Sequence, residues 1–175
     1  MITIVMGVSG SGKSTIGGDL AAHLGLPFID GDSLHPQANR DKMAAGIPLD
    51  DADRQPWLEA IVAVMDKHRA NHVSLVLACS ALKRRYRNFL RSSHDDVRFV
   101  YLHASRELLA ERLGHRPGHF FNPALLDSQL ATLEEPSRSE AVWIETTDAP
   151  AAIVEKVIRA GCAEARRATR PVPGA

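Results

Sequence analysis

The sequence has few cysteines, few aromatic residues, no excess charge of either sign and no long apolar run. Its two cysteines, Cys79 and Cys162, are too few for a disulfide framework and lack zinc-ligand spacing, so we expect both to be reduced thiols. Twenty-one basic and twenty-one acidic residues give a formal net charge of zero. That balance argues against a global field that would drive binding to nucleic acid or to an anionic membrane.

No apolar stretch approaches the roughly 20 residues of a membrane span, and the N-terminus lacks a secretory signal. The sequence therefore predicts a cytoplasmic protein with no nucleic acid and no membrane among its partners. With 175 residues, 45% of them apolar and 24% charged, the chain has the composition of one globular domain. We expect a single domain over 1–175, with a flexible tail at about 167–175.

Short apolar runs alternate with longer segments of helical period, which predicts an α/β fold. We expect a five-stranded parallel sheet between two layers of helices. The predicted strands are 2–6, 27–29, 73–78, 97–102 and 141–145. The predicted helices are one containing Ile16, Leu20 and Leu24, then 36–45, 51–71, 83–91, 105–113 and 123–133, and a last one containing 153–161.

A glycine-rich segment directly follows the first strand and precedes a helix, and it matches the phosphate-loop pattern G-x-x-x-x-G-K-[ST] in full. The chance count of such a match in this composition is on the order of 10⁻³. Glycines let backbone N–H groups point at phosphate oxygens, and the helix start adds its positive end. The pattern predicts binding of ATP with Mg²⁺ by Gly7, Ser9, Gly10, Ser11, Gly12, Lys13, Ser14 and Thr15.

Within this site Lys13 is expected to reach the β and γ phosphates, and Ser14 to supply a hydroxyl to Mg²⁺. The chain carries neither an Asp-x-x-Gly switch nor an Asn-Lys-x-Asp guanine reader, which disfavours a GTPase. The third strand ends without the aspartate that a typical motor ATPase places there. A small-molecule kinase is the class of phosphate-loop protein that remains favoured.

Asp30 and Asp32 follow the second strand, at the sheet edge where doubly wound folds bind ligands. We assign Asp30 to the metal, and Asp32 to orienting a substrate hydroxyl and taking its proton. The alternative is an ordinary Asp-Gly turn, which the adjacent phosphate loop disfavours.

A basic segment follows the third strand at the same edge, where Ser80 and either Lys83 or Arg85 could hold an anionic, polyhydroxylated substrate. A solvated helix face or a weak nucleic-acid patch is the alternative, and we prefer solvent exposure for Arg84 and for Arg91. Arg54 could bind a carboxylate, or pair with Asp50 or Asp51 on the surface.

Residues 114–122 are rich in Gly, Pro, His and Phe and have no periodicity, which predicts a lid loop that carries function. Arg112, Arg116 and His119 flank or occupy this loop. We expect Arg116 to act on the transferring phosphoryl group, Arg112 to contact the nucleotide and His119 to contact the substrate. A solvated loop arginine is the alternative for Arg116.

Residues 6–136 resemble the small gluconate kinases, whose architecture is related to that of shikimate and nucleoside monophosphate kinases. The resemblance is carried by the phosphate loop and by Asp30-Gly31-Asp32, Leu34-His35-Pro36, Asp53-Arg54-x-Pro56-Trp57-Leu58, Cys79-Ser80-Ala81-Leu82-Lys83, Gly118-His119-Phe120-Phe121 and Thr132-Leu133-Glu134-Glu135-Pro136. It implies ATP-dependent phosphorylation of D-gluconate to 6-phosphogluconate, and a homodimer. The Arg84-Arg85 pair departs from the family pattern.

Gluconate suits the residues identified above: its carboxylate could pair with Arg54, Lys83 or Arg85, and its hydroxyls with Asp32, His35 and Ser80. Two alternatives remain at this point. One is a kinase for another small hydroxy acid such as shikimate, and the other is a regulatory module that binds ATP without catalysis.

Overall fold

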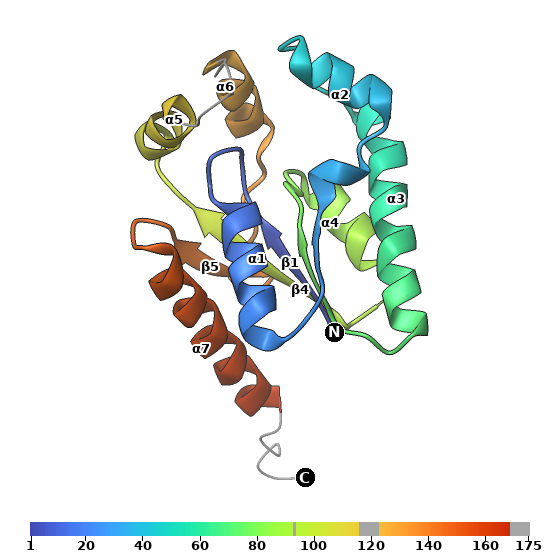
Figure 1. Cartoon of the computed structure of the whole chain (residues 1–175), viewed down its shortest axis with the longest axis vertical. Coiled ribbons are helices and arrows are strands. Elements are labelled where there is room, and N and C mark those ends of the chain that lie inside the picture. The colour runs from blue at the N-terminus through green and yellow to red at the C-terminus, as the bar shows by residue number, and fades with distance from the viewer. Residues whose placement is uncertain (93, 116–122, 169–175) are drawn as a thin grey trace.

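The computed structural model describes residues 1–92, 94–115 and 123–168, with 162–168 described in their backbone only (Figure 1). The strands are β1 Ile2–Met6, β2 Phe28–Asp30, β3 Leu75–Ala78, β4 Val97–His103 and β5 Ala141–Glu145. The helices are α1 Lys13–Leu24, the 3-10 turn η1 Gly31–Leu34, α2 Gln37–Ala44, α3 Asp51–Ala70, α4 Arg84–Arg91, α5 Arg106–Gly114, α6 Pro123–Thr132 and α7 Pro150–Ala168.

The five strands form one parallel sheet in the order β2-β3-β1-β4-β5, which confirms the predicted fold class. Because all strands run the same way, their carboxyl ends meet at one edge of the sheet. The chain leaves β1 toward β2 and β3 on one side and later crosses to β4 and β5 on the other. The end of β1 therefore lies at the point where strand order reverses, which is where doubly wound sheets bind ligands.

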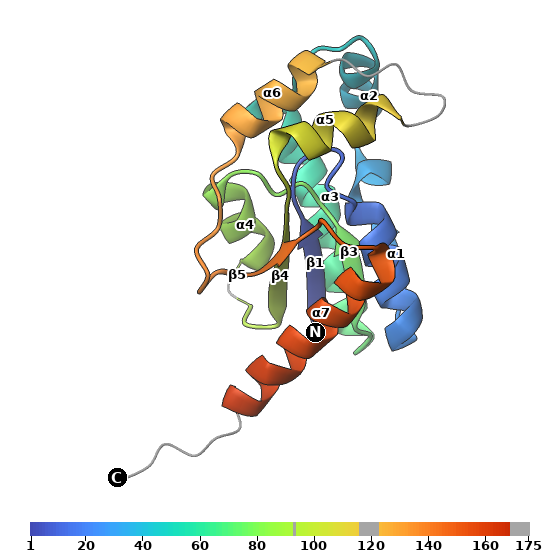
Figure 2. The same ribbon diagram turned by 90° about the vertical axis from the view of Figure 1, so that its left-hand side faces the viewer.

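Helices cover both faces of the sheet, as Figures 1 and 2 show. On one face, residues of α3 and α4, such as Trp57, Ile61 and Leu90, pack against alternate side chains of β1, β3 and β4. On the other face, residues of α1 and α7, such as Leu20 and Val154, pack against the intervening side chains. The near-continuous apolar runs of the strands follow from this burial on both faces.

Three helices, α2, α5 and α6, lie beyond the carboxyl edge rather than on a face (Figures 1 and 2). A small apolar cluster joins α5 and α6 to the loops below them; its buried members are Val8, Leu82, Leu109 and Leu126. This arrangement puts α2 on one side of the edge and α5 with α6 on the other (Figure 1). Among the described residues, no helix is long and apolar enough to cross a membrane.

Several boundaries differ from the expected ones. Leu24, expected on the apolar stripe of the first helix, is 46% exposed because α1 ends there, before the left-handed cap at Gly25. Val73 is 41% exposed, and the third strand begins only at Leu75. Cys79 is buried, and burial raises the pKa of its thiol to about 12, as expected of an inert reduced cysteine. The Cys162 side chain and most of the expected lid and tail lie outside the described residues.

Candidate active site

The phosphate loop turns from β1 into α1 through glycines with positive backbone angles. Gly7, Gly10 and Gly12 have φ values of 147°, 82° and 94°, which side-chain-bearing residues rarely adopt. Gly12 is also the N-cap of α1, and it brings no side chain to the first-turn N–H groups; that turn contains no acidic residue. The start of α1 therefore keeps the positive end and the N–H donors that bind phosphate.

Two side chains of the loop fit a phosphate ligand. Lys13 Nζ donates to the Val8 carbonyl oxygen at 3.0 Å, so the ammonium group lies folded over the loop. The Ser11 hydroxyl is buried, with 1% of the residue exposed, and has no hydrogen-bond partner among the described residues. Buried hydroxyls usually have a partner, and a phosphate oxygen bound in the loop could supply one.

The two expected metal ligands lie next to each other. Ser14 Oγ donates to Asp30 Oδ2 at 2.5 Å, and Asp30 Oδ1 accepts the Asp32 backbone N–H at 3.0 Å. Within the described part of the chain, no group of three or more His, Cys, Asp or Glu residues could hold a metal ion. A cation here would take few ligands from the protein and the rest from phosphate and water, which is the coordination that Mg²⁺ favours.

A cavity of about 330 Å³ opens beside the phosphate loop. It brings together six of the residues selected from the sequence: Ser9, Lys13, Asp32, His35, Arg54 and Ser80. They come from the loop after β1 and the first residue of α1, from η1 and the turn that follows it, from α3 and from the segment after β3. The remaining wall is largely apolar and is formed by Met43, Ile47, Pro48, Leu49, Trp57, Leu82, Leu113, Leu125, Leu126, Ser128 and Gln129. A largely apolar pocket with a few convergent polar groups is typical of a small-molecule site.

Close packing at Gly31 fixes the aspartates on either side of it. A Cβ at Gly31 would lie 2.5 Å from the Ala78 carbonyl oxygen, so only glycine lets η1 approach β3 this closely. The buried Trp57 side chain donates from Nε1 to the Gly31 carbonyl oxygen at 2.7 Å. Trp57 is thus a core residue, as predicted, and it also holds the turn that presents Asp32 to the cavity.

His35 is held as a neutral ring. It stacks on Trp57 with ring centroids 4.3 Å apart, and it is 6% exposed. Burial lowers its pKa below the ordinary 6.5, the Arg54 charge adds to this, and Asp32 opposes it. The Asn39 amide nitrogen lies 3.2 Å from His35 Nδ1 and also donates to the Asp53 carbonyl oxygen at 2.7 Å. If Asn39 donates to Nδ1, the proton is on Nε2, and His35 can donate a hydrogen bond.

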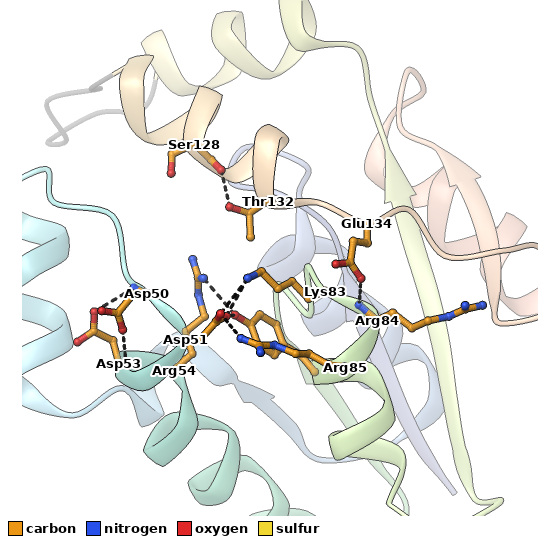
Figure 3. A network of polar contacts seen from close by, with 11 residues as sticks. Asp50, Asp51, Asp53, Arg54, Lys83, Arg84, Arg85, Ser128, Thr132 and Glu134 are labelled. Carbon is orange, nitrogen blue, oxygen red and sulfur yellow. Dashed lines mark hydrogen bonds and ion pairs between the residues drawn. The ribbon is translucent and has the colours of Figure 1, made fainter.

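Arg54, Lys83 and Arg85, hereafter the basic cluster, gather around Asp51 and Tyr86 (Figure 3). Lys83 Nζ lies 2.9 and 3.1 Å from the Asp51 carboxylate oxygens, and Arg85 and the Tyr86 hydroxyl also bind that carboxylate. Arg54 instead donates to the Tyr86 hydroxyl at 3.3 Å. Of the three cations, Arg54 alone lines the cavity among the residues that the structure describes.

The start of α4 is fixed by residues that follow α6. The Glu134 carboxylate accepts the Arg84 backbone N–H at 2.7 Å, and the Glu134 N–H donates to the Leu82 carbonyl oxygen at 2.9 Å (Figure 3). Arg87, with 1% of its side chain exposed, pairs with Glu140 at 2.6 Å. It also donates to the carbonyl oxygens of Ala81, Leu82 and Glu134. Sequence reasoning missed Arg87, because nothing in a run of basic residues marks which one is buried.

The other predicted residues fall elsewhere. Arg112 donates to Thr146 Oγ1 at 3.1 Å and to the Thr146 carbonyl oxygen, which holds its guanidinium beside the end of β5 and outside the cavity. Thr15 is exposed on α1. Arg91 is not simply solvated, because it is half-buried over the Phe99 ring at 5.4 Å. Arg116 and His119 lie outside the described residues.

A phosphate loop after the central strand, a carboxylate pair at the end of β2 and a pocket with a few convergent polar groups define a small-molecule kinase of the phosphate-loop class. The family described as shikimate kinase matches residues 9–161. Shikimate kinase from Aquifex aeolicus superposes with a TM-score of 0.62 over 94% of this chain and 98% of that one, at 17% identity, which shows the fold alone.

Other relatives are much more similar in sequence. The gluconokinase of Gluconobacter oxydans is 47% identical over 158 residues, which cover 89% of this chain and 88% of the relative. The crystal structure of a gluconokinase from Sinorhizobium meliloti has a TM-score of 0.83 at 44% identity and covers 97% of each chain. The chain belongs to the gluconokinase family. The resemblance that the sequence motifs suggested is therefore confirmed.

Proposed function

We propose that the protein transfers the terminal phosphoryl group of ATP to the terminal hydroxyl of D-gluconate, forming 6-phosphogluconate and ADP. The observation that carries the proposal is the shared cavity, which is lined by Lys13 of the phosphate loop, Asp32 and Arg54. The names of the relatives, gluconokinases at more than 40% identity over most of the chain, support the substrate.

The reaction needs positioning and charge stabilisation more than covalent chemistry. Lys13 and the first-turn N–H groups of α1 would stabilise negative charge on the phosphoryl oxygens. Asp32 would orient the acceptor hydroxyl and take its proton as the hydroxyl oxygen bonds to phosphorus and the bond to ADP breaks. The rigid turn supports this role, because Trp57 and the close packing at Gly31 fix the segment that carries Asp32.

Three further side chains of the cavity suit a sugar acid. Arg54 offers the guanidinium charge for the carboxylate, and its contact with the Tyr86 hydroxyl leaves other N–H groups for the substrate. His35 offers a donor at Nε2 in the tautomer described above, and Ser80 offers a hydroxyl. We therefore assign the carboxylate to Arg54 rather than to Lys83 or Arg85, whose charges are directed at Asp51.

Several finer assignments belong to this proposal. Ser14 and Asp30 would hold Mg²⁺, which when bound neutralises charge on the phosphates and bridges them. We also propose a single-domain, cytoplasmic enzyme that works as a homodimer, with no nucleic acid or membrane partner. The roles of Arg112, Arg116 and His119, and of the lid at 114–122, stay predictions.

A coupled assay of ADP release tests the proposal. The purified chain is given ATP and Mg²⁺ with gluconate, other aldonates or shikimate, and 6-phosphogluconate is identified by mass. We expect gluconate to be used with a kcat/KM about 100-fold or more above that of shikimate, because a pocket built for one set of hydroxyls rejects another.

The alternatives give different results. ATP binding without substrate-dependent ADP release would indicate a regulatory module and would contradict the proposal. Preferential turnover of shikimate would make shikimate the substrate and would contradict the assignment of gluconate. Strong, salt-dependent binding of DNA or RNA would favour a nucleic-acid role for the basic segment.

A further inference from the structure

Gln129 joins α6 to the phosphate loop across 120 positions of sequence. Its side-chain Oε1 accepts the Ser9 backbone N–H at 2.8 Å, and its Nε2 donates to Ser9 Oγ at 2.9 Å. Both polar atoms of the carboxamide are thus used on a single residue of the loop. None of the motifs described above contains Gln129, and nothing about its residue type predicts this contact.

The pair of contacts fixes the direction of the Ser9 hydroxyl. A backbone N–H can only donate, so the Gln129 atom that faces it must be the carbonyl oxygen, and the amide nitrogen must face Ser9 Oγ. Ser9 Oγ therefore accepts from Gln129, which leaves its own O–H to donate elsewhere. Ser9 lines the cavity together with Lys13 and Asp32.

The Ser9 hydroxyl opens onto the same cavity as the two groups that would act on the phosphoryl group. If Lys13 binds the terminal phosphate and Asp32 the acceptor hydroxyl, the transfer takes place in this cavity, which Ser9 also lines. A donor that is already directed at developing charge stabilises the transition state without reorganisation.

We propose that Gln129 is a positioning residue for phosphoryl transfer: it holds Ser9 so that the hydroxyl of Ser9 donates to an oxygen of the transferring phosphoryl group. The inference rests on the proposed function for its catalytic consequence. The packing of α6 does not need this carboxamide, because Leu126 and Leu130 already fix the helix in the apolar cluster with Val8 and Leu109.

The test compares Gln129→Met, which keeps the length of the side chain and removes both hydrogen bonds, with Ser9→Ala and with the double variant. Gln55→Met is the control, because Gln55 lies on the exposed side of α3 and bonds only to Glu59 among the contacts described here. For each protein we would measure kcat and KM for gluconate, the melting temperature, and Kd for ADP and for a non-hydrolysable ATP analogue.

We expect Gln129→Met to lower kcat about 10-fold, with KM for gluconate within about twofold of the wild type. Affinity for the ATP analogue should fall several-fold while affinity for ADP stays unchanged, because only the analogue carries the terminal phosphate. Ser9→Ala should behave alike, and the double variant should lose no more than the worse single variant, because both changes remove one interaction.

Three results would overturn the inference: an unchanged kcat and analogue affinity in Gln129→Met, an equal loss of ADP affinity, or losses that multiply in the double variant. A lower melting temperature with proportionate loss of all activities would assign Gln129 a purely structural role. If the wild type does not phosphorylate gluconate, the proposed function fails. The effect of the variants on affinity for the ATP analogue, relative to that for ADP, still tests the contact between Ser9 and the terminal phosphate.

Discussion

Helices α1 and α4 both begin at the carboxyl edge of the sheet, each after a buried strand and each with lysine at or next to its first residue. At α1, the cap is Gly12 and the first turn has no acidic residue. At α4, the Glu134 carboxylate accepts the first N–H, and Asp51 pairs with Lys83. The start of α1 is left without an acidic side chain, whereas the start of α4 is bound by carboxylates of the protein itself.

Positive charge at a sheet edge does not by itself make an anion site, as the start of α4 shows. At α4, Lys83 and Arg85 both bind the Asp51 carboxylate of α3, and the first N–H of the helix binds the Glu134 carboxylate of the segment after α6. These contacts join three parts of the chain. Arg54 belongs to the same cluster but bonds to a neutral hydroxyl there and lines the cavity. Which cation binds substrate is decided by where the acidic side chains lie.

The comparison is tested most strongly at Lys13. We expect Lys13→Met to lower kcat by about 10³-fold or more, because a charge that stabilises the phosphoryl oxygens is lost. Lys83→Met, the same change at α4, should lower kcat/KM by no more than about fivefold, because a partly exposed ion pair is worth little. Steady-state kinetics at saturating ATP, with circular dichroism to check folding, decide between them. Comparable losses in the two variants would remove the distinction.

A second large effect is expected at Asp32. Replacement by Asn keeps the shape and loses the proton acceptor, so kcat should fall by about 10²- to 10⁴-fold with a small change in KM for gluconate. Asp41→Asn, on the exposed surface of α2, is the matched control. A nearly normal kcat in Asp32→Asn would take the residue out of the reaction and leave it as part of the turn.

Within the basic cluster the comparison is between Arg54 and Arg85. Arg54→Met should raise KM for gluconate by about 10- to 100-fold, the value of a charged hydrogen bond in a cavity. Arg85→Met should raise it by no more than about fivefold, because 58% of the Arg85 side chain is exposed and its partner is Asp51. A larger increase in KM for Arg85→Met than for Arg54→Met would place the substrate carboxylate at α4 and would contradict our assignment.

Much of the fold and of the nucleotide site could be predicted, because the relevant signals are local in sequence. The phosphate loop is a contiguous segment whose residue types follow from backbone geometry, and the strands are marked by apolar runs. Asp30 and Asp32 could be placed at the sheet edge because every parallel strand ends at the same edge, and their roles stay predictions. Helix α5 is also marked locally, because Ser105 caps it by accepting the Leu108 N–H.

Partners distant in sequence could not be predicted. Asp51 and Lys83 are 32 positions apart, Arg84 and Glu134 are 50 apart, and Ser9 and Gln129 are 120 apart. No periodicity links such pairs, so nothing in the sequence indicated that Lys83 and Arg85 pair with Asp51. The bonds of Arg112 to Thr146 likewise had no signal in the sequence, and its contact with the nucleotide stays a prediction.

The smallest predicted effect concerns His35 and the pH dependence of stability. Burial lowers the pKa of His35 below 6.5 in the folded protein, so the unfolded chain takes up the proton more readily. The stability that neutral His35 contributes is therefore fully present above about pH 6.5 and is lost as the pH falls through its lowered pKa. His35→Gln should reduce this fall relative to the wild type, as measured by urea unfolding between about pH 5 and 8. His23→Gln, at an exposed position of α1, controls for the loss of one histidine. If the unfolding free energy depends on pH in the same way in the wild type and in His35→Gln, the ring beside Trp57 is not held neutral by its burial.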